Sequence, residues 1–182
     1  MPRLPFQTAL LLAPLTYALH HFEEHVVFNF RAWRLRYFAD NNHLSTEAVL
    51  CILITIGMVY VLLHATIRSR RTAAMAVLFL MATQVHNILF HVGGTLVFGD
   101  FSPGTYTALG LYLPANLLVV RSAIAEGHLT PRSSAGLFVA GGAIFWAFEV
   151  FGPVVLVLVT SVTWAAIAVD ARKSARGRSR PA

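Results

Sequence analysis

The chain has 182 residues, of which 57% are hydrophobic and 12% charged, and its mean hydropathy is +0.65. Soluble domains carry about 25% charged residues, so this composition excludes a soluble enzyme, a disordered chain and a DNA-binding domain. The formal net charge of +6 does not indicate nucleic acid as a partner, because no Lys or Arg interrupts the long apolar segments and basic residues crowd the C-terminal tail. The composition predicts an all-α fold, a polytopic transmembrane helical bundle.

Six membrane helices are expected. The first four cover approximately residues 4–30, 47–67, 72–98 and 104–120. The first helix is expected to be retained rather than cleaved as a signal peptide, because no small-residue cleavage site follows its apolar run, and Pro14 should kink it. Residues 31–37 alternate arginine with Trp33, Leu35 and Tyr37, which is typical of a segment that lies in the membrane interface.

Helix boundaries are indicated by capping residues and by one Gly-Pro pair. Ser45 or Thr46 can cap the second helix, and Pro103 suits the start of the fourth. Residues 134–169 form an apolar stretch of about 36 residues, too long for one span of about 20. With Gly152-Pro153 in its middle, this stretch is either two short helices or one long kinked helix.

The positive-inside rule favours two helices, because the Arg68–Arg71 turn and the basic tail then share the cytoplasmic side; five helices would separate them. We therefore expect residues 1–170 to form one domain of the inner (plasma) membrane with both termini inside, and residues 171–182 to be a disordered basic tail. One feature opposes this topology, since Arg31, Arg34 and Arg36 would then lie outside.

Titratable residues inside the apolar helices carry the functional signal. They comprise three of the eight acidic residues and the five histidines of the first and third helices: Glu23, Glu24, Glu149, His20, His21, His25, His86 and His91. An ionised group in hydrocarbon costs about 2.5–3.5 kcal/mol even on insertion scales. These side chains must therefore be protonated, paired with protonated histidine, exposed to a water-filled cavity or bound to a metal ion.

The spacing of these residues places several of them together. His20 lies three and four residues before Glu23 and Glu24, so the three share one helix face. His21 and His25 form a second pair, four residues apart, on an adjacent face, and we interpret them as interfacial.

Helix depth gives a second argument. In this topology the first, third and fifth helices run in the same direction. At about 1.5 Å per residue, one layer about 20–30 Å from the cytoplasmic side contains His20, His86, His91 and Glu149. Asn87 precedes His91 by one turn. His64 lies near the other end of its helix and is interpreted as a packing residue, as are His43 and His128 in loops.

The motif His20-x-x-Glu23-Glu24 resembles the signature of the HXXEE family of small bacterial membrane proteins. The resemblance implies two downstream motifs, which Asn87-x-x-x-His91 and Ser102-Pro103-Gly104 match in order. Phe101 departs from the pattern, which implies a tyrosine there. The resemblance covers most of the chain and supplies candidate residues, but it implies no reaction.

The first functional hypothesis is a membrane-embedded metal-dependent hydrolase that acts on a lipid-like substrate. A divalent ion, Zn²⁺ or Fe²⁺, would be bound by His20, Glu24 and His91. Glu23 would be the general base, Asn87 would orient a ligand or polarise a carbonyl, and the Pro103-Gly104 turn would lie over the mouth of the site. A di-iron oxidoreductase is the variant, in which Glu23, His86 and Glu149 would join the three ligands.

Two other hypotheses need no metal. The cluster of His and Glu could be the proton relay of a proton-coupled transporter or channel, although six short helices without a repeat make a poor alternating-access machine unless the chain forms a homodimer. The third hypothesis is a structural or accessory subunit whose polar cluster holds helices together. In every case membrane lipids are the expected partners.

Overall fold

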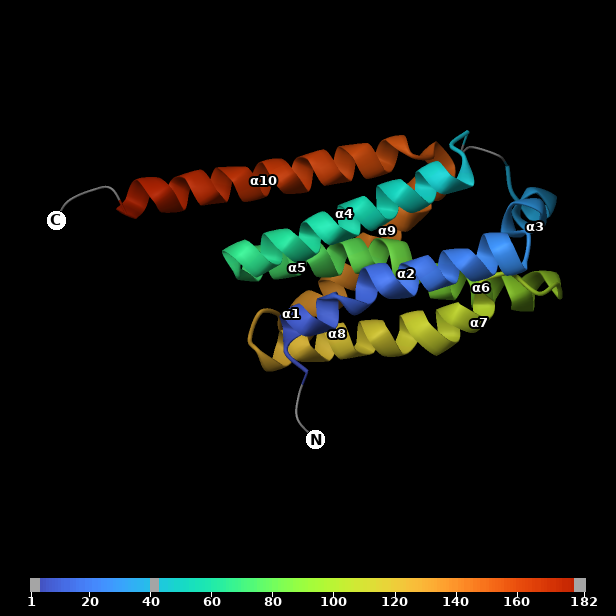
Figure 1. The fold of residues 1–182 in the computed structure, drawn as a ribbon, viewed down its shortest axis with the longest axis horizontal. Helices are drawn as coiled ribbons and strands as arrows, with labels where there is room; N and C mark the ends of the chain where they lie inside the picture. Colours follow the sequence, from blue (N-terminus) through green and yellow to red (C-terminus); the bar gives the residue numbers. More distant parts are fainter. Residues whose placement is uncertain (1–3, 40–42, 179–182) are drawn as a thin grey trace.

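The computed structural model describes residues 4–39 and 43–178, and within these ranges every regular element is helical (Figure 1). The elements are α1 (Phe6–Leu10), α2 (Leu12–Phe22), the π-helical turn η1 (Glu23–Val27), α3 (Phe30–Tyr37), α4 (Thr46–Ile67), α5 (Arg70–Leu80), the π-helical turn η2 (Met81–Val85), α6 (His86–Phe98), α7 (Thr105–Thr107), the π-helical turn η3 (Ala108–Tyr112), α8 (Leu113–Ala125), α9 (Pro131–Phe151) and α10 (Val154–Arg178).

Four helical rods are long and apolar enough to cross a membrane: Thr46–Ile67, Arg70–Phe98, Thr105–Ala125 and Pro131–Phe151. The rod from α1 to η1 and the apolar part of α10 pack beside them, so the chain traverses the bundle six times (Figure 1). The predicted all-α membrane bundle is confirmed.

The Gly-Pro pair separates two helices rather than bending one. Helix α9 ends at Phe151, Gly152 adopts a left-handed φ of 72°, and α10 starts at Val154 and returns along the bundle (Figure 1). Helix α10 continues to Arg178, where the sequence analysis expected an irregular tail from residue 171. The expectation for residues 179–182 lies outside the described residues.

The ends of the rods follow local chemistry. Ser45 caps α4 by accepting a hydrogen bond from the Ala48 N–H, and Ser69 and Thr72 form a reciprocal capping box at the start of α5. The first rod is interrupted at Leu11, one turn before Pro14, whose missing N–H removes one helical hydrogen bond.

An apolar core fills the half of the bundle that contains the chain termini and the Arg68–Arg71 turn. Its buried members come from α1, α2, α4, α5, η2, α8 and the α8–α9 loop: Phe6, Ala9, Leu10, Ala13, Ile56, Tyr60, Val61, Ala73, Ala76, Val77, Leu80, Met81, Val119, Ala123 and Leu129. This end of the bundle is therefore closed by packing, and the buried titratable groups described below lie toward the other end.

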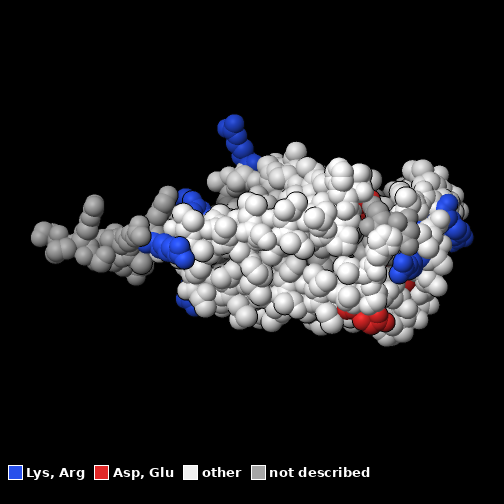
Figure 2. Space-filling view, turned by 90° about the horizontal axis from the view of Figure 1, so that it is seen from above, with Lys and Arg blue, Asp and Glu red and all other residues white. Residues whose placement is uncertain are grey.

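The surface is an apolar band between two charged ends (Figure 2). The band contains many exposed leucine, valine and phenylalanine side chains, as lipid-facing helices require. The arginines of α3, which opposed the topology, are paired at their end of the bundle: Arg34 lies 2.8 Å from Glu149, and Arg36 lies 3.0 Å from Asp100. These pairs hold two of the three α3 arginines against the bundle.

Both termini should lie on the cytoplasmic side, because the start of α1, the end of α10 and the Arg68–Arg71 turn lie at the same end of the bundle (Figure 1). A reporter enzyme fused to the C-terminus and active only in the cytoplasm should therefore be active. Activity only of a reporter that requires the outer side would contradict the six-helix topology.

Gly141 permits α9 to lie against η2. A Cβ atom at this position would lie 2.5 Å from Met81 Cβ and 2.9 Å from the Ala82 nitrogen. Gly141→Ala should therefore destabilise the protein by about 1–3 kcal/mol, measured as a lower thermal unfolding midpoint in detergent. Gly136→Ala on the same helix is the control, because its Cβ would meet nothing within 4 Å; an equal loss in both variants would contradict this packing.

Candidate functional site

Three residues of the first and third rods converge on one buried point. The Glu24 Oε1 atom lies 3.4 Å from His20 Nε2 and 3.1 Å from His91 Nε2. His20 and His91 are 1% and 0% exposed, and Glu24 is buried with them. One potential metal-ligating atom from each residue lies within 4.8 Å of the other two. The sequence placed His20 and His91 in one layer and Glu24 on the same helix face as His20, and the structure brings the three side chains together.

The two histidines are incompletely satisfied. The Nε2 atoms of His20 and His91 are buried, and neither has a hydrogen-bond partner among the described residues. Buried polar atoms almost always have such a partner, so each exception calls for an explanation. Both atoms face the same carboxylate oxygen, Glu24 Oε1, within ion-pair distance but without hydrogen-bond geometry.

The opposite nitrogen of each imidazole is hydrogen-bonded to a hydroxyl group. His20 Nδ1 lies 2.8 Å from Thr107 Oγ1, and His91 Nδ1 lies 2.9 Å from Ser102 Oγ. The Thr107 hydroxyl donates its own proton to Glu23, so it can only accept from His20. His20 is therefore protonated at Nδ1, which leaves a lone pair on Nε2.

Glu23, the general base expected from the sequence, is bound by the loop before α7 and by α7 itself. Its carboxylate accepts hydrogen bonds from the backbone N–H groups of Gly104, Tyr106 and Thr107, and from the Thr107 hydroxyl. These donors stand at the start of α7, where backbone N–H groups otherwise lack partners. The carboxylate thus accepts four hydrogen bonds, two at each oxygen.

Gly104 lies directly against both imidazole rings. Its φ is 101°, and a Cβ atom would lie 2.8 Å from the Cε1 atoms of His20 and His91. The Pro103-Gly104 turn therefore packs against both histidine rings. It was expected to lie over the mouth of the site, but residues 102–107 do not line the adjoining cavity.

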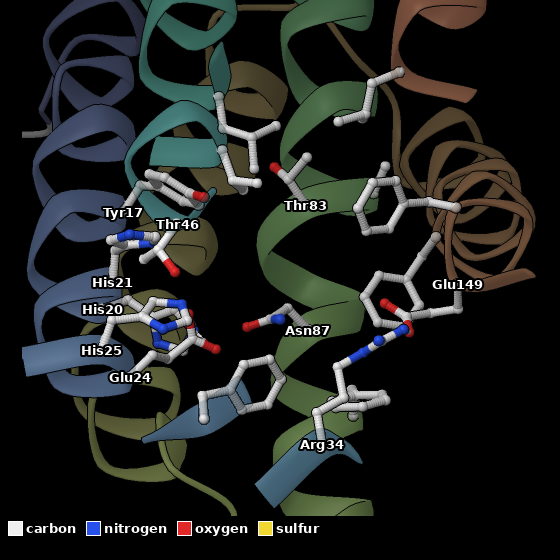
Figure 3. A pocket seen from close by; sticks show the side chains of 18 of the residues that line it. Tyr17, His20, His21, Glu24, His25, Arg34, Thr46, Thr83, Asn87 and Glu149 are labelled. Carbon is white, nitrogen blue, oxygen red and sulfur yellow. Dashed lines mark hydrogen bonds and ion pairs between the residues drawn. The ribbon is translucent and has the colours of Figure 1, made fainter. Parts of the chain in front are cut away.

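A cavity of about 170 Å³ opens beside Glu24 (Figure 3). One water needs roughly 10–15 Å³ by this measure, so the cavity has room for part of a larger molecule. Apolar side chains form most of the lining: Leu44, Val49, Leu53, Phe90, Ile144, Phe145, Phe148 and Leu156. Asn87 reaches across the cavity toward Glu24, and its buried Oδ1 lacks a partner among the described residues (Figure 3).

His86 and Glu149, two of the three added ligands of the di-iron variant, do not join the cluster. His86 is turned toward α9, where its ring packs on Phe138 and its Nδ1 lies 3.0 Å from the Met81 carbonyl. Glu149 lines the cavity but forms an ion pair with Arg34, across from the cluster (Figure 3). Equal depth along the bundle does not fix the direction of a side chain around its helix, and these two side chains point away from the cluster.

The second histidine pair lies next to the cluster. His21 is buried rather than interfacial as expected, and its ring centroid is 4.4 Å from that of His25. His25 Nε2 lies 3.7 Å from the second oxygen of Glu24. His64, in contrast, lies at the other end of the bundle beside His128, as its predicted packing role implies.

Several contributors were not identified from the sequence. Ser102 and Thr107 hold the histidines, and Tyr112 packs its ring 4.4 Å from His20 with a buried hydroxyl that has no partner among the described residues. Polar residues that flank the Pro-Gly motif could have suggested the first two. Phe101 packs on Phe28 and Tyr106, so the aromatic position that departs from the pattern is outside the cluster.

Comparison with known protein families agrees with these motifs. The family described as "Protein of unknown function with HXXEE motif" matches residues 11–119, so the chain belongs to that family. The matched segment includes all three converging residues and the Pro-Gly turn, and it ends before α9. No curated protein and no solved structure matches the chain.

Gly104→Ala should disturb the cluster because its methyl group would collide with both imidazole rings. The expected loss is about 2–4 kcal/mol, the sum of the cost of overpacking and of a strained φ, measured by thermal unfolding in detergent. Gly99→Ala is the control, because Gly99 also has a positive φ, of 61°, but has open space around it. Equal losses would mean that only backbone strain matters at Gly104.

Proposed function

We propose that this member of the HXXEE family is a membrane-embedded, metal-dependent enzyme, a hydrolase that acts on a lipid-like substrate. Its divalent ion, Zn²⁺ or Fe²⁺, is bound by His20, Glu24 and His91. The observation that carries the proposal is the convergence of two orphaned imidazole nitrogens on one buried carboxylate.

The donor set supports a catalytic rather than a structural metal. Two imidazoles and one carboxylate are the protein ligands of many catalytic zinc and non-haem iron sites, in which open positions remain for water or substrate. Such an ion supplies Lewis acidity and activates water near neutral pH. Thr107 and Ser102 support the same assignment, since hydrogen bonds at Nδ1 orient a histidine for binding through Nε2.

The cavity supports a lipid-like substrate. It adjoins Glu24, its lining is mostly apolar, and it lies within a bundle whose outer surface is the apolar band. Asn87 reaches into the cavity from α6 with an unpartnered amide oxygen. Its amide N–H group is the donor that we assign to orienting a substrate carbonyl beside the ion.

The two adjacent glutamates have different roles in this proposal because they have different contacts. Glu24 faces the histidines and is the metal ligand, whereas Glu23 binds the α7 backbone and positions Thr107 behind His20. Glu23 thus acts on the metal site through the loop.

The alternative is a proton relay, favoured by the continuous series His21, His25, Glu24 and His91, in which neighbours are 3.1–4.4 Å apart by closest atoms or ring centroids. A relay across the membrane would have to continue toward the other end of the bundle. Between the cluster and His64 stands the apolar core that includes Leu10, Val77 and Leu80. This barrier is why we favour the enzyme.

Elemental analysis of the detergent-purified protein tests the proposal. The wild-type protein should contain bound Zn or Fe, and His20→Ala, His91→Ala and Glu24→Gln should each lower the content of that metal at least tenfold, since each removes a ligand atom. His86→Ala is the matched control, because His86 is also buried and lies on α6, but it faces α9.

Wild-type protein that binds no metal under any metal supplement would falsify the proposal. The relay would then require a pH-dependent proton flux in vesicles that Glu24→Gln abolishes. Metal loss in His86→Ala equal to that in His91→Ala would mean that the content reports general unfolding and not a specific site.

A further inference from the structure

Glu24 presents its two carboxylate oxygens to two different pairs of histidines. Oε1 lies near His20 and His91, whereas Oε2 lies 3.7 Å from His25 Nε2. The ring of His21 lies tilted against that of His25, and His21, His25 and Glu24 each offer a ligand atom within 4.8 Å of the other two. Each side of the Glu24 carboxylate therefore has its own pair of histidines: His20 and His91 on the Oε1 side, and His21 and His25 on the Oε2 side.

We propose that a second divalent ion binds to His21, His25 and the Oε2 atom of Glu24, so that Glu24 bridges two ions. The inference rests on the proposed function, since it needs the first ion at His20 and His91. It differs from the di-iron variant predicted from the sequence, because the second ion takes the neighbouring histidine pair and neither His86 nor Glu149.

The local helix explains how both pairs form in one segment. His21 and His25 are four residues apart, the spacing with which two histidines on one helix bind a single metal ion. His20 and Glu24 have the same spacing one residue earlier. The π-helical turn η1 begins at Glu23. It contains Glu24, which belongs to both groups, and His25, which belongs to the second. Such turns are frequent at functional sites.

A second observation points independently to a ligand. The Nε2 atom of His21 is buried and has no hydrogen-bond partner among the described residues, and His21 as a whole is 6% exposed. An imidazole that served only for packing would leave this polar atom unsatisfied. His21 and His25 both line the cavity, so an ion between them could be reached by the substrate.

The charge of a two-ion site is partly offset by nearby carboxylates. Glu24 lies between the ions, and the Glu23 carboxylate, which the α7 backbone holds, precedes it in the chain. A hydroxide shared by the ions would remove a further positive charge. In carboxylate-bridged sites the ions lie about 3.5–4 Å apart, and they stabilise the attacking and the leaving oxygen together.

Metal stoichiometry tests the inference. Wild-type protein purified in detergent and saturated with Mn²⁺ should hold two ions per chain, and their electron paramagnetic resonance spectrum should show a spin-coupled pair. His21→Ala and His25→Ala should each hold one ion with an uncoupled six-line spectrum, because the His20, Glu24 and His91 ligands remain. His86→Ala should retain two coupled ions, as it removes a buried histidine of similar size from outside both groups.

The outcomes separate this inference from the proposed function. One uncoupled ion per wild-type chain, lost in His20→Ala, would overturn the second site and leave the first standing. No bound ion would overturn both. The wild-type spectrum alone decides between one ion and a coupled pair, so the test does not depend on the folding of any variant.

Discussion

The structure depends on the burial of two adjacent carboxylates inside an apolar helix bundle. In hydrocarbon each carboxylate needs partners that offset the cost of its burial, and the two carboxylates have different kinds of partner. Glu23 receives three backbone N–H groups and a hydroxyl from the start of α7, whereas Glu24 receives histidine side chains from two rods. Because Glu23 fixes the α7 segment, it also fixes Thr107 behind His20 and Gly104 against both imidazole rings. The satisfaction of one carboxylate thus sets the geometry around the other.

The sequence was sufficient to predict the rods, their direction and the depth of polar residues, because these follow from hydrophobic length, charge bias and the rise per residue. It did not reveal how each helix is rotated about its axis, although regular helical spacing already restricted which residues of one helix could face Glu24 together. At about 100° per residue, His86 and His91 point about 140° apart, so both could not face Glu24. Glu149 points away from the cluster for another reason: its partner, Arg34, belongs to α3, a short helix outside the spans, whose position only the tertiary fold determines.

The three π-helical turns were invisible in the sequence, and they explain why rotation is hard to derive. Each adds to the residues in one turn, so every later side chain is rotated relative to a regular helix. η1 carries Glu24, η2 carries cavity-lining Thr83 one turn before Asn87, and η3 ends at Tyr112 beside His20. All three π-helical turns thus contribute residues around the same cavity. Regular helical geometry would have aimed these side chains in other directions.

The cavity is built from two parts of the chain with different relations to the family. The residues that converge on Glu24 lie within the matched segment 11–119, whereas one wall, with Ile144, Phe145, Phe148 and Glu149, belongs to α9 beyond it. In the proposed enzyme, the metal ligands thus lie within the matched segment, and one part of the cavity wall lies beyond it. A chain with another helix in the place of α9 could retain the donors of His20, Glu24 and His91 and accept a molecule of different shape. Selectivity can in this way diverge while the chemistry is inherited unchanged.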